Sequence, residues 1–363
     1  MRHFMAKSAS LTAFLLALFL ILPGRPVAKV TGQCANCHTM HNSQNGTDVV
    51  SGGPYGTLLV GNCVGCHTGT NTGGTTDTGA TPYVMGTSAP TFGTDTLAGG
   101  NFWWVENVTD AKGHNVVTAN DDGVLTSAPG VSTGSSCGTD SCHDNLNRVP
   151  SAESGKNGCQ SCHLNVMHHA NDGTGTKYVD TAAKGWYRFL SGHMGGAGIG
   201  VKGIEDSGWG YGATVGGTNH NEYLGNAAAK TSSGGFSACG NTTTGFCTGC
   251  HGNFHIENDS ADGSGNWSRH PSDAVIPNSG EYASISTNYN PNVPVARPAG
   301  FTWADGSSSS ATPGTDMVMC LSCHVAHGSP YDDLLRWDYS AMNAGGGDNN
   351  TGCFVCHTNK DDA

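Results

Sequence analysis

Positive charge is scarce in this chain. Lys and Arg together number 16 against 28 Asp and Glu, so the formal net charge at pH 7 is −12. This sign disfavours a nucleic-acid partner, because binding to phosphate relies on clusters of basic side chains. The simplest meaning of the charge is that it keeps a secreted protein in solution.

Long apolar runs are also lacking, with one exception close to the N-terminus. Residues 11–22 form an apolar run that follows a basic stretch and leads into small residues ending near Ala28. A membrane span needs about 20 apolar residues, so residues 1–28 are predicted to be a secretory signal, with a retained membrane anchor as the alternative. No second run follows, and the mature chain, residues 29–363, is expected to be soluble. Cleavage changes the formal charge from −12 to −15, because the signal holds three basic residues and no acidic one.

Hydrophobic periodicity is the third feature that the chain lacks. Gly accounts for 55 of 363 residues, and long segments show neither helical nor strand periodicity. By composition, much of the chain is too polar to build a conventional apolar core. We therefore expect mostly irregular coil with short α-helices, one of them within residues 331–342, and little strand. Covalently attached cofactors would supply the missing apolar surface.

Cysteine, in contrast, is abundant and patterned. The sequence C-x-x-C-H is the signature of c-type haem attachment, in which two thiols form thioethers to the haem and the His takes an axial position on iron. Zinc is the alternative, but a structural zinc ion needs four ligands, whereas here each Cys pair is followed at once by a single His. We expect a short helical turn at each motif. The motif occurs six times, as Cys34/Cys37/His38, Cys63/Cys66/His67, Cys159/Cys162/His163, Cys247/Cys250/His251, Cys320/Cys323/His324 and Cys353/Cys356/His357.

A seventh site has a wider gap. Cys137 and Cys142 are separated by four residues, and His143 follows directly. We predict a seventh covalent haem c here, the alternative being two free or disulfide-bonded cysteines beside an ordinary His. Seven sites use 14 of the 15 cysteines. The one left over, Cys239, is predicted to be an unreacted thiol, with an intermolecular disulfide as the alternative.

The remaining histidines are candidates for the second axial position on each iron. Of 17 histidines, one lies in the signal and seven belong to the motifs, which leaves nine. Seven irons need at most seven further ligands, so bis-His ligation is expected, with Met40, Met85, Met167 or Met194 as alternatives at one or two sites. His220 is the first choice for a spare His, and one of the adjacent pair His168 and His169 is the second. The candidate ligands are His41, His114, His168, His169, His193, His255, His270 and His327.

The spacing of some of these histidines restricts which iron they can reach. The two axial nitrogens of one haem lie on opposite faces of a wide ring, and a tether of three or four residues can hardly pass round it. Such a His must therefore serve a different haem, which draws neighbouring haems into close pairs. His114 and His270 lie in irregular loops and are able to reach a distant iron. The closely spaced cases are His41 after His38, His327 after His324 and His255 after His251.

The mature chain is predicted to be one domain. Neighbouring haems are expected to share a core, with the chain wrapped around a linear haem array. Haem pairs are expected near residues 34–67, 137–169 and 320–357, and one further haem near residues 247–255.

Several stretches are similar to known proteins. Cys34–Ser43 resembles the start of the outer-surface hexahaem cytochromes that polymerise into extracellular nanowires in metal-reducing bacteria. Cys320–Tyr331, Leu335–Trp337 and Cys353–His357 resemble the wider multihaem family with doubled motifs. The resemblance implies a continuous chain of bis-His haems and a head-to-tail homopolymer in which a His near one end ligates a haem of the next subunit. By motif match that residue is His41. The seventh motif and the large Gly-rich inserts depart from the pattern and leave the interface and the haem order open.

Three functions are compared with these sequence features. The first is long-range electron transfer by a secreted protein at or beyond the outer membrane, as a filament subunit that exchanges electrons with partner cytochromes or extracellular acceptors. The second is a non-polymerising shuttle in the periplasm or on an outer-membrane conduit. The third is a reductase of nitrogen or sulfur oxyanions, which needs an open axial position. Such enzymes often mark that position with C-x-x-C-K, which this sequence lacks, so an electron carrier is expected rather than an enzyme.

Overall fold

A computed structural model describes a large part of the chain. The sites at Cys137, Cys142 and His143, together with Cys250, Cys239, His168, His169, His193 and His255, lie outside the described residues. The described residues are 33–44, 46–49, 58–61, 63–69, 82–115, 159, 162–163, 177–190, 200–206, 214–227, 240–249, 251, 270–302, 306–347 and 351–361.

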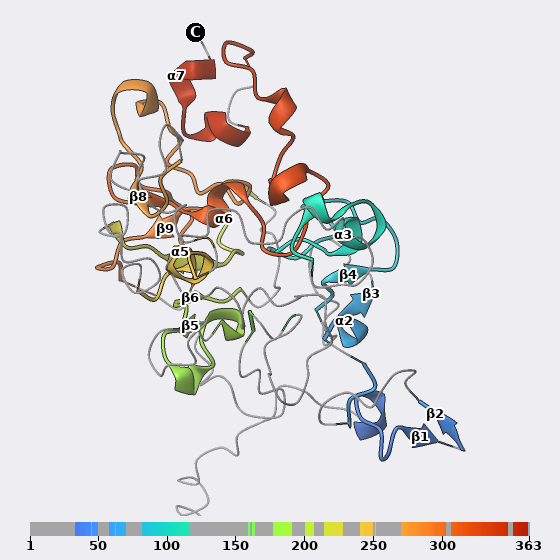
Figure 1. Cartoon of the computed structure of the whole chain (residues 1–363). Coiled ribbons are helices and arrows are strands. Elements are labelled where there is room, and N and C mark those ends of the chain that lie inside the picture. Colours follow the sequence, from blue (N-terminus) through green and yellow to red (C-terminus); the bar gives the residue numbers. More distant parts are fainter. Residues whose placement is uncertain are drawn as a thin grey trace, which may run out of the picture.

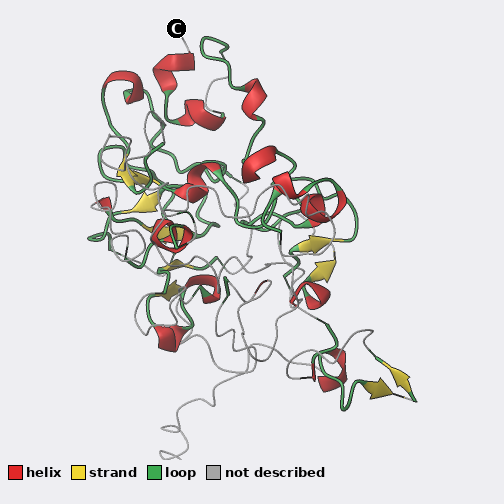
Figure 2. Ribbon diagram, viewed as in Figure 1, coloured by secondary structure: helices red, strands yellow, loops and turns green. Residues whose placement is uncertain are grey.

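The described chain is mostly irregular, with short helices, as the composition predicts (Figure 2). The α-helices are single turns: α2 (Cys63–Cys66), α3 (Trp103–Asn107), α5 (Thr243–Cys247), α6 (Cys320–Cys323) and α7 (Thr358–Asp361). The 3₁₀ turns are η1 (Cys34–Asn36), η3 (Asp110–Lys112), η5 (Ala182–Lys184), η6 (Tyr187–Phe189), η9 (Gly280–Tyr282), η10 (Asp332–Leu334), η11 (Tyr339–Ala341) and η12 (Gly352–Val355).

Each C-x-x-C-H motif forms one helical turn. In all six, the backbone N–H of the His donates to the carbonyl of the first Cys, from 2.8 Å in His38 to 3.0 Å in His357. This is the i to i+4 bond of an α-helix, and it places the first thiol and the imidazole one turn apart on the same side. The prediction of short helical turns at these motifs is confirmed.

Cys162 lies in a turn just after Cys159 and not within a helix, as the second cysteines Cys37 and Cys356 also do. Its backbone N–H donates to the carbonyl of Cys159, three residues back, at 3.3 Å. Such an i to i+3 bond belongs to the tighter 3₁₀ type of turn, whose hydrogen bonds have poorer geometry than those of an α-helix. The corresponding second cysteines Cys66 and Cys323, in contrast, lie within α2 and α6. The role of Cys162 in holding haem stays a prediction.

The helix expected within residues 331–342 is absent as a single element, and that prediction is wrong. Two separate turns, η10 and η11, lie on either side of Arg336 and Trp337. Leu334 has φ of 59°, in the left-handed region, and it ends the first turn. The extended backbone that follows lets the buried Arg336 donate from Nε to the carbonyls of Leu321 at 2.7 Å and His324 at 3.0 Å, so this segment braces the 320–324 motif.

Strands are two or three residues long, yet six of them form one sheet. The order is β5-β6-β7-β9-β10-β8, with β7 and β9 parallel and the other pairs antiparallel. Its members are β5 (Tyr178–Val179), β6 (Gly203–Ile204), β7 (Glu222–Leu224), β8 (Ala274–Val275), β9 (Ala296–Arg297) and β10 (Met317–Val318). Two smaller pairs join β1 (Ser43–Gln44) to β2 (Thr47–Asp48) and β3 (Thr68–Gly69) to β4 (Met85–Gly86).

The sheet holds the largest buried cluster among the described residues. Tyr223, Ala296 and Met317 meet across β7, β9 and β10, and Val201 and Met319 are buried with them. β10 runs through Met319 directly into α6, so the sheet fixes the start of the Cys320 motif. Four-residue and shorter elements gain little from helix or strand propensity, so this packing is what orders them.

The two ends of the described chain lie at opposite ends of the molecule. Figure 1 shows η1, β1 and β2 projecting at one end, in blue, and α7 at the other, in red. In the part of the chain that the structure describes, no helix has the length and apolar character needed to cross a membrane.

Candidate haem sites

The motif and spare histidines are anchored through the same ring nitrogen. In five of them Nδ1 lies 2.6 to 2.9 Å from a backbone carbonyl oxygen. An imidazole that donates from Nδ1 carries its lone pair on Nε2, in a fixed orientation, which is the arrangement of most metal-ligating histidines. The pairs are His67 with Pro82, His114 with Ala326, His163 with Arg188, His270 with Pro271 and His324 with Asp333.

The protein around several of these rings keeps them neutral. Burial lowers the pKa of His114 and His163, against the smaller opposing effect of the Nδ1 hydrogen bond. For His327, burial and repulsion from His163 and His114 lower the pKa to about 3. A neutral imidazole is the form that binds a metal, so these rings are in the ligating state at neutral pH.

Three pairs of histidine rings lie at the same distance from each other. Each pair joins one motif His to one spare His from a distant part of the chain, and in each the ring centroids are 6.2 Å apart. The angles between the ring planes are 52°, 51° and 84°. The pairs are His251 with His114, His163 with His327 and His357 with His270.

This recurring distance fits one metal ion between two imidazoles. An imidazole nitrogen lies about 2.0 Å from a bound metal and its ring centre about 1.1 Å further, so two rings on opposite sides of one iron have centres about 6 Å apart. Packed aromatic rings span a range of distances, and three equal values are not expected from packing alone. Among the described residues, no group of three or more His, Cys, Asp and Glu side chains gathers in the way that a metal cluster needs. The 6.2 Å separation of two imidazoles in each pair fits the two axial positions of one haem iron.

Two of the spare histidines are set by one interlocked structure, which we call the strap. It consists of residues 99–114 and 326–329. The backbone N–H of His327 donates to Gly99 at 2.7 Å, and that of His114 donates to His327 at 3.1 Å. His114 also binds the Ala326 carbonyl through Nδ1 at 2.7 Å. The strap thus aims His114 at one motif and His327 at another, and it fixes the separation of the two sites.

Comparison with known proteins gives one family-model match and two similar solved structures. Residues 312–362 match the family model of the doubled CXXCH motif, and this stretch contains the last two motifs of the chain. No curated protein sequence matches the chain. The outer membrane cytochrome S filament from Geobacter sulfurreducens is 19% identical, with 87% of this chain and 86% of that chain covered and a TM-score of 0.51. The OmcS nanowires from the same organism, seen by cryo-EM, are 20% identical with coverage of 88% and 86% and a TM-score of 0.45.

The chain has the fold of a multihaem c-type cytochrome. At this level of identity the first of these structures establishes the fold alone, and the second adds no argument.

Thiols of the N-terminal motifs lie close to one another. A hydrogen bond from Cys159 lowers the pKa of Cys63, which places these two motifs side by side. Burial, followed by repulsion from Cys37, raises the pKa of Cys66. The first motif therefore contacts the second, and the second contacts the one at residues 159–163.

The two cysteines of the 159–163 motif are near each other and half-buried. The hydrogen bond with Cys63, followed by burial, raises the pKa of Cys159, and repulsion from Cys162 adds to the rise. The turn that contains Cys162 leads directly into His163, whose ring faces His327. The motif therefore runs from Cys159 and Cys162 directly to one of the three ring pairs, as haem attachment at these two thiols would require.

The C-terminal motifs are joined in the same way. A hydrogen bond with Cys247 lowers the pKa of Cys320. Burial, followed by repulsion from Cys353 and Cys356, raises the pKa of Cys323 to about 12. With the strap between the two halves, the six described motifs follow one another in the order 34–38, 63–67, 159–163, 247–251, 320–324 and 353–357.

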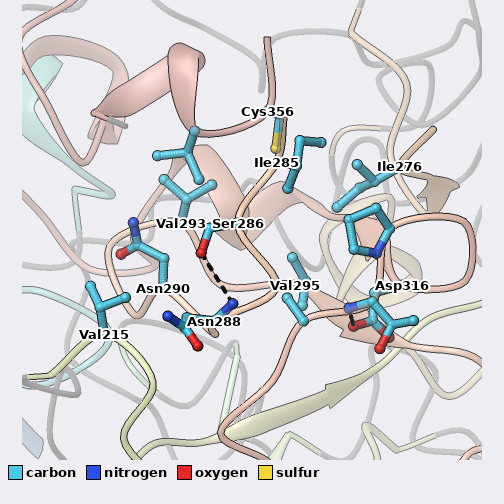
Figure 3. Close-up of a pocket in the computed structure, with 14 residues that line it drawn as sticks. Val215, Ile276, Ile285, Ser286, Asn288, Asn290, Val293, Val295, Asp316 and Cys356 are labelled. Atoms are coloured by element: carbon cyan, nitrogen blue, oxygen red, sulfur yellow. Dashed lines mark hydrogen bonds between the residues drawn. The ribbon is translucent and has the colours of Figure 1, made fainter. Parts of the chain in front are cut away.

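The last motif borders an apolar pocket of about 290 Å³ (Figure 3). The Cys356 thiol lies at its edge, and Ile276, Ile285, Val293 and Val295 line it. An apolar wall beside an attachment thiol suits the porphyrin face, because a macrocycle covalently held there would remove these side chains from water. The pocket therefore fits a haem attached at this motif.

His220 differs from the other described histidines in the contacts of its ring nitrogens. Its Nδ1 lies 2.8 Å from the Asn221 carbonyl oxygen and its Nε2 lies 2.9 Å from that of Ser308. The ring is 3% exposed and stacks on Tyr289 at 3.6 Å. With both nitrogens engaged, this ring has none left for iron, which favours the expectation that His220 is spare.

His41 is exposed and lies two residues before β1. Its neighbour Met40 is 73% exposed, while Thr39 is buried. The described part of the chain therefore leaves the His41 ring exposed to solvent.

Some contacts to the sites carry no recognisable sequence signal. The strap is one, because hydrogen bonds between loops leave no pattern. Gly99 is another, since a Cβ at this position would lie 2.7 Å from Nδ1 of His327. Glu281 is a third, because it contacts His357 from a loop far along the chain.

Proposed function

We propose that this protein carries electrons over long distances through a row of covalently attached haems. The observation that carries the proposal is the set of three ring pairs at 6.2 Å, each joining a motif His to a His from elsewhere in the chain. Haem iron supplies the redox chemistry when bound, by cycling between the ferric and ferrous states. The chain supplies the ligands, the spacing and the low-polarity surroundings.

The proposed ligands are assigned pair by pair. His114 completes the site of His251, His327 that of His163, and His270 that of His357. Because His327 follows His324 by three residues yet faces His163, one short loop contributes to two sites and holds them close, as electron hopping requires. The proposal extends to seven haems in one domain, residues 29–363, with Cys137, Cys142 and His143 holding one, and with His168, His169, His193 and His255 among the remaining candidate ligands.

The site of action that fits this function is outside the cell. The predicted signal, residues 1–28, would direct secretion, and the OmcS structure of the same fold is a filament. We propose a head-to-tail homopolymer in which His41, exposed at one end, ligates a haem of the neighbouring subunit. Partner cytochromes and extracellular acceptors would exchange electrons with its ends.

A carrier is favoured over an oxyanion reductase by the supply of axial ligands. A reductase must leave one iron open to its substrate, whereas here both sides are provided at each of the three paired sites. A non-polymerising shuttle shares the ligand chemistry, and it differs only in remaining a monomer.

Electron paramagnetic resonance of the purified ferric protein tests the carrier proposal. All iron is expected to be low-spin, as for bis-His ligation. His114→Ala should convert the iron at the His251 site to high-spin, while His220→Gln should leave every iron low-spin. A resting protein with a strong high-spin signal, or a His114→Ala protein without one, would contradict the proposal.

A further inference from the structure

The motif His at the C-terminal site differs from the others in what anchors it. His357 binds a carboxylate, with its Nδ1 2.8 Å from Oε1 of Glu281. Where the structure describes an Nδ1 contact for another histidine of a motif or ring pair, the partner is a backbone carbonyl oxygen. His163 and His324 are examples. A carboxylate is negatively charged and a stronger acceptor than a carbonyl.

Glu281 is held in place by the helix that follows the motif. Its own carbonyl accepts from Oγ1 of Thr358 at 3.0 Å, and the Gly280 carbonyl accepts from Nδ2 of Asn359 at 3.1 Å. Oε2 lies 3.5 Å from Nζ of Lys360, whose side chain is 59% exposed. The loop of η9 is therefore docked on α7, and both carboxylate oxygens have a defined neighbour.

We propose that Glu281 is a positioning residue that lowers the reduction potential of the haem held by Cys353, Cys356 and His357. This rests on the proposed haem ligation. A partly exposed glutamate is ionised at neutral pH. Its charge draws the Nδ1 proton and enriches the imidazole in electrons, and an electron-rich ligand stabilises ferric over ferrous iron. Lys360 partly offsets this charge, so the two side chains set the potential in opposite directions.

The same site offers its own spectroscopic marker. The planes of His270 and His357 are 84° apart, against 52° and 51° in the other two ring pairs. Nearly perpendicular imidazoles leave two iron d orbitals close in energy, which makes the ferric low-spin signal highly anisotropic. Among the three described ring pairs, a redox titration that follows this signal therefore reports on the His357 site alone.

The experiment compares variants of the full-length, haem-loaded protein by that titration at neutral pH and low ionic strength, where exposed charges are least screened. Glu281→Gln keeps an acceptor for Nδ1 but removes the charge, and it should shift the midpoint of the anisotropic signal upward. Lys360→Met removes the offsetting charge at an exposed position and should shift it downward. Asp338→Asn, which removes an exposed carboxylate that binds Ser340, is the matched control and should leave the midpoint unchanged.

A midpoint that is unchanged in Glu281→Gln, or that moves the same way in Glu281→Gln and Lys360→Met, overturns the proposal. Opposite shifts cannot arise from a loss of structure common to both. Haem counting by mass spectrometry separates this failure from that of the proposed function: a chain without haem at Cys353 and Cys356 would contradict the proposed ligation itself.

Discussion

The histidines of this chain differ in which ring nitrogens make hydrogen bonds. His163 and His324 use Nδ1 to bind a carbonyl, which leaves Nε2 as the ligating nitrogen, whereas His220 has both nitrogens engaged. The C-x-x-C-H motifs could be read from the sequence because the haem chemistry fixes their spacing. The partner of each spare His could not, since it depends on how loops far apart in the chain pack together.

Gly99 allows His327 to reach its site. A Cβ at residue 99 would lie 2.7 Å from Nδ1 of the His327 ring, closer than real Cβ contacts allow. Gly99→Ala should displace the imidazole and turn the iron at the His163 site partly high-spin, as measured by electron paramagnetic resonance. Gly300→Ala is the control, because nothing lies within 4 Å of its Cβ. Equal spectra for the two variants would show that the close contact is not restrictive.

Asp273 gives the stability a pH dependence. Burial raises its pKa to about 6 from the ordinary 3.8, against the opposing effect of the hydrogen bond from Thr244. The folded state therefore holds this proton more tightly than the unfolded chain, and the free energy of unfolding should fall by about 3 kcal/mol as the pH rises from about 4 to about 6. Chemical denaturation at several pH values measures this. Asp273→Asn should remove that part of the slope, and an unchanged slope would contradict it.

At the scale of the element, short pieces are ordered by what they contact. The sequence correctly predicts a helical turn at each motif, because that turn is local. It does not predict the six-stranded sheet, whose two-residue strands such as β8 and β9 are too short to leave a periodic pattern. It wrongly predicts a helix around Arg336, where the side chain instead reaches the carbonyls of the 320–324 motif.

The sheet depends on a buried ion pair network. Arg297 in β9, 1% exposed, binds Glu222 in β7 at 2.6 Å and Asp316 beside β10 at 2.5 Å. Arg297→Met should leave two buried carboxylates without a cation and lower the free energy of unfolding by about 3 to 5 kcal/mol. Chemical denaturation followed by circular dichroism measures the loss.

The control for that prediction is the more exposed pair of Lys184 and Asp180, 2.8 Å apart. Lys184→Met should cost less than about 1 kcal/mol, as exposed ion pairs do. A similar loss in the two variants would mean that burial of the Arg297 network contributes nothing.

At the scale of the whole molecule, the candidate sites form one row. Thiol contacts join the motifs in each half, and the strap joins the halves, so the described chain runs from the His38 site to the His357 site without a break in contact. The linear array was predicted from motif number and spacing. Its order was not, because the inserts between the motifs vary in length and carry no repeat.

Polymerisation is tested at His41. If this exposed ring ligates a haem of the next subunit, His41→Ala should keep all seven haems attached but abolish filaments in electron micrographs, with size-exclusion chromatography showing monomers. Ser43→Ala, at an exposed neighbouring position, is the control and should form filaments normally. Filaments in the His41→Ala protein would exclude this residue as the link. A wild-type protein that is itself monomeric would favour the shuttle instead.

The central claim is that spare histidines from distant loops complete the haem sites in a continuous row. Electron cryo-microscopy of the secreted, haem-loaded protein tests it most directly. We predict a map with an iron between His251 and His114, between His163 and His327, and between His357 and His270, in one unbroken line of haems. A map in which these rings lie on different haems, or in which the line is interrupted between the 159–163 and 247–251 sites, would contradict the account.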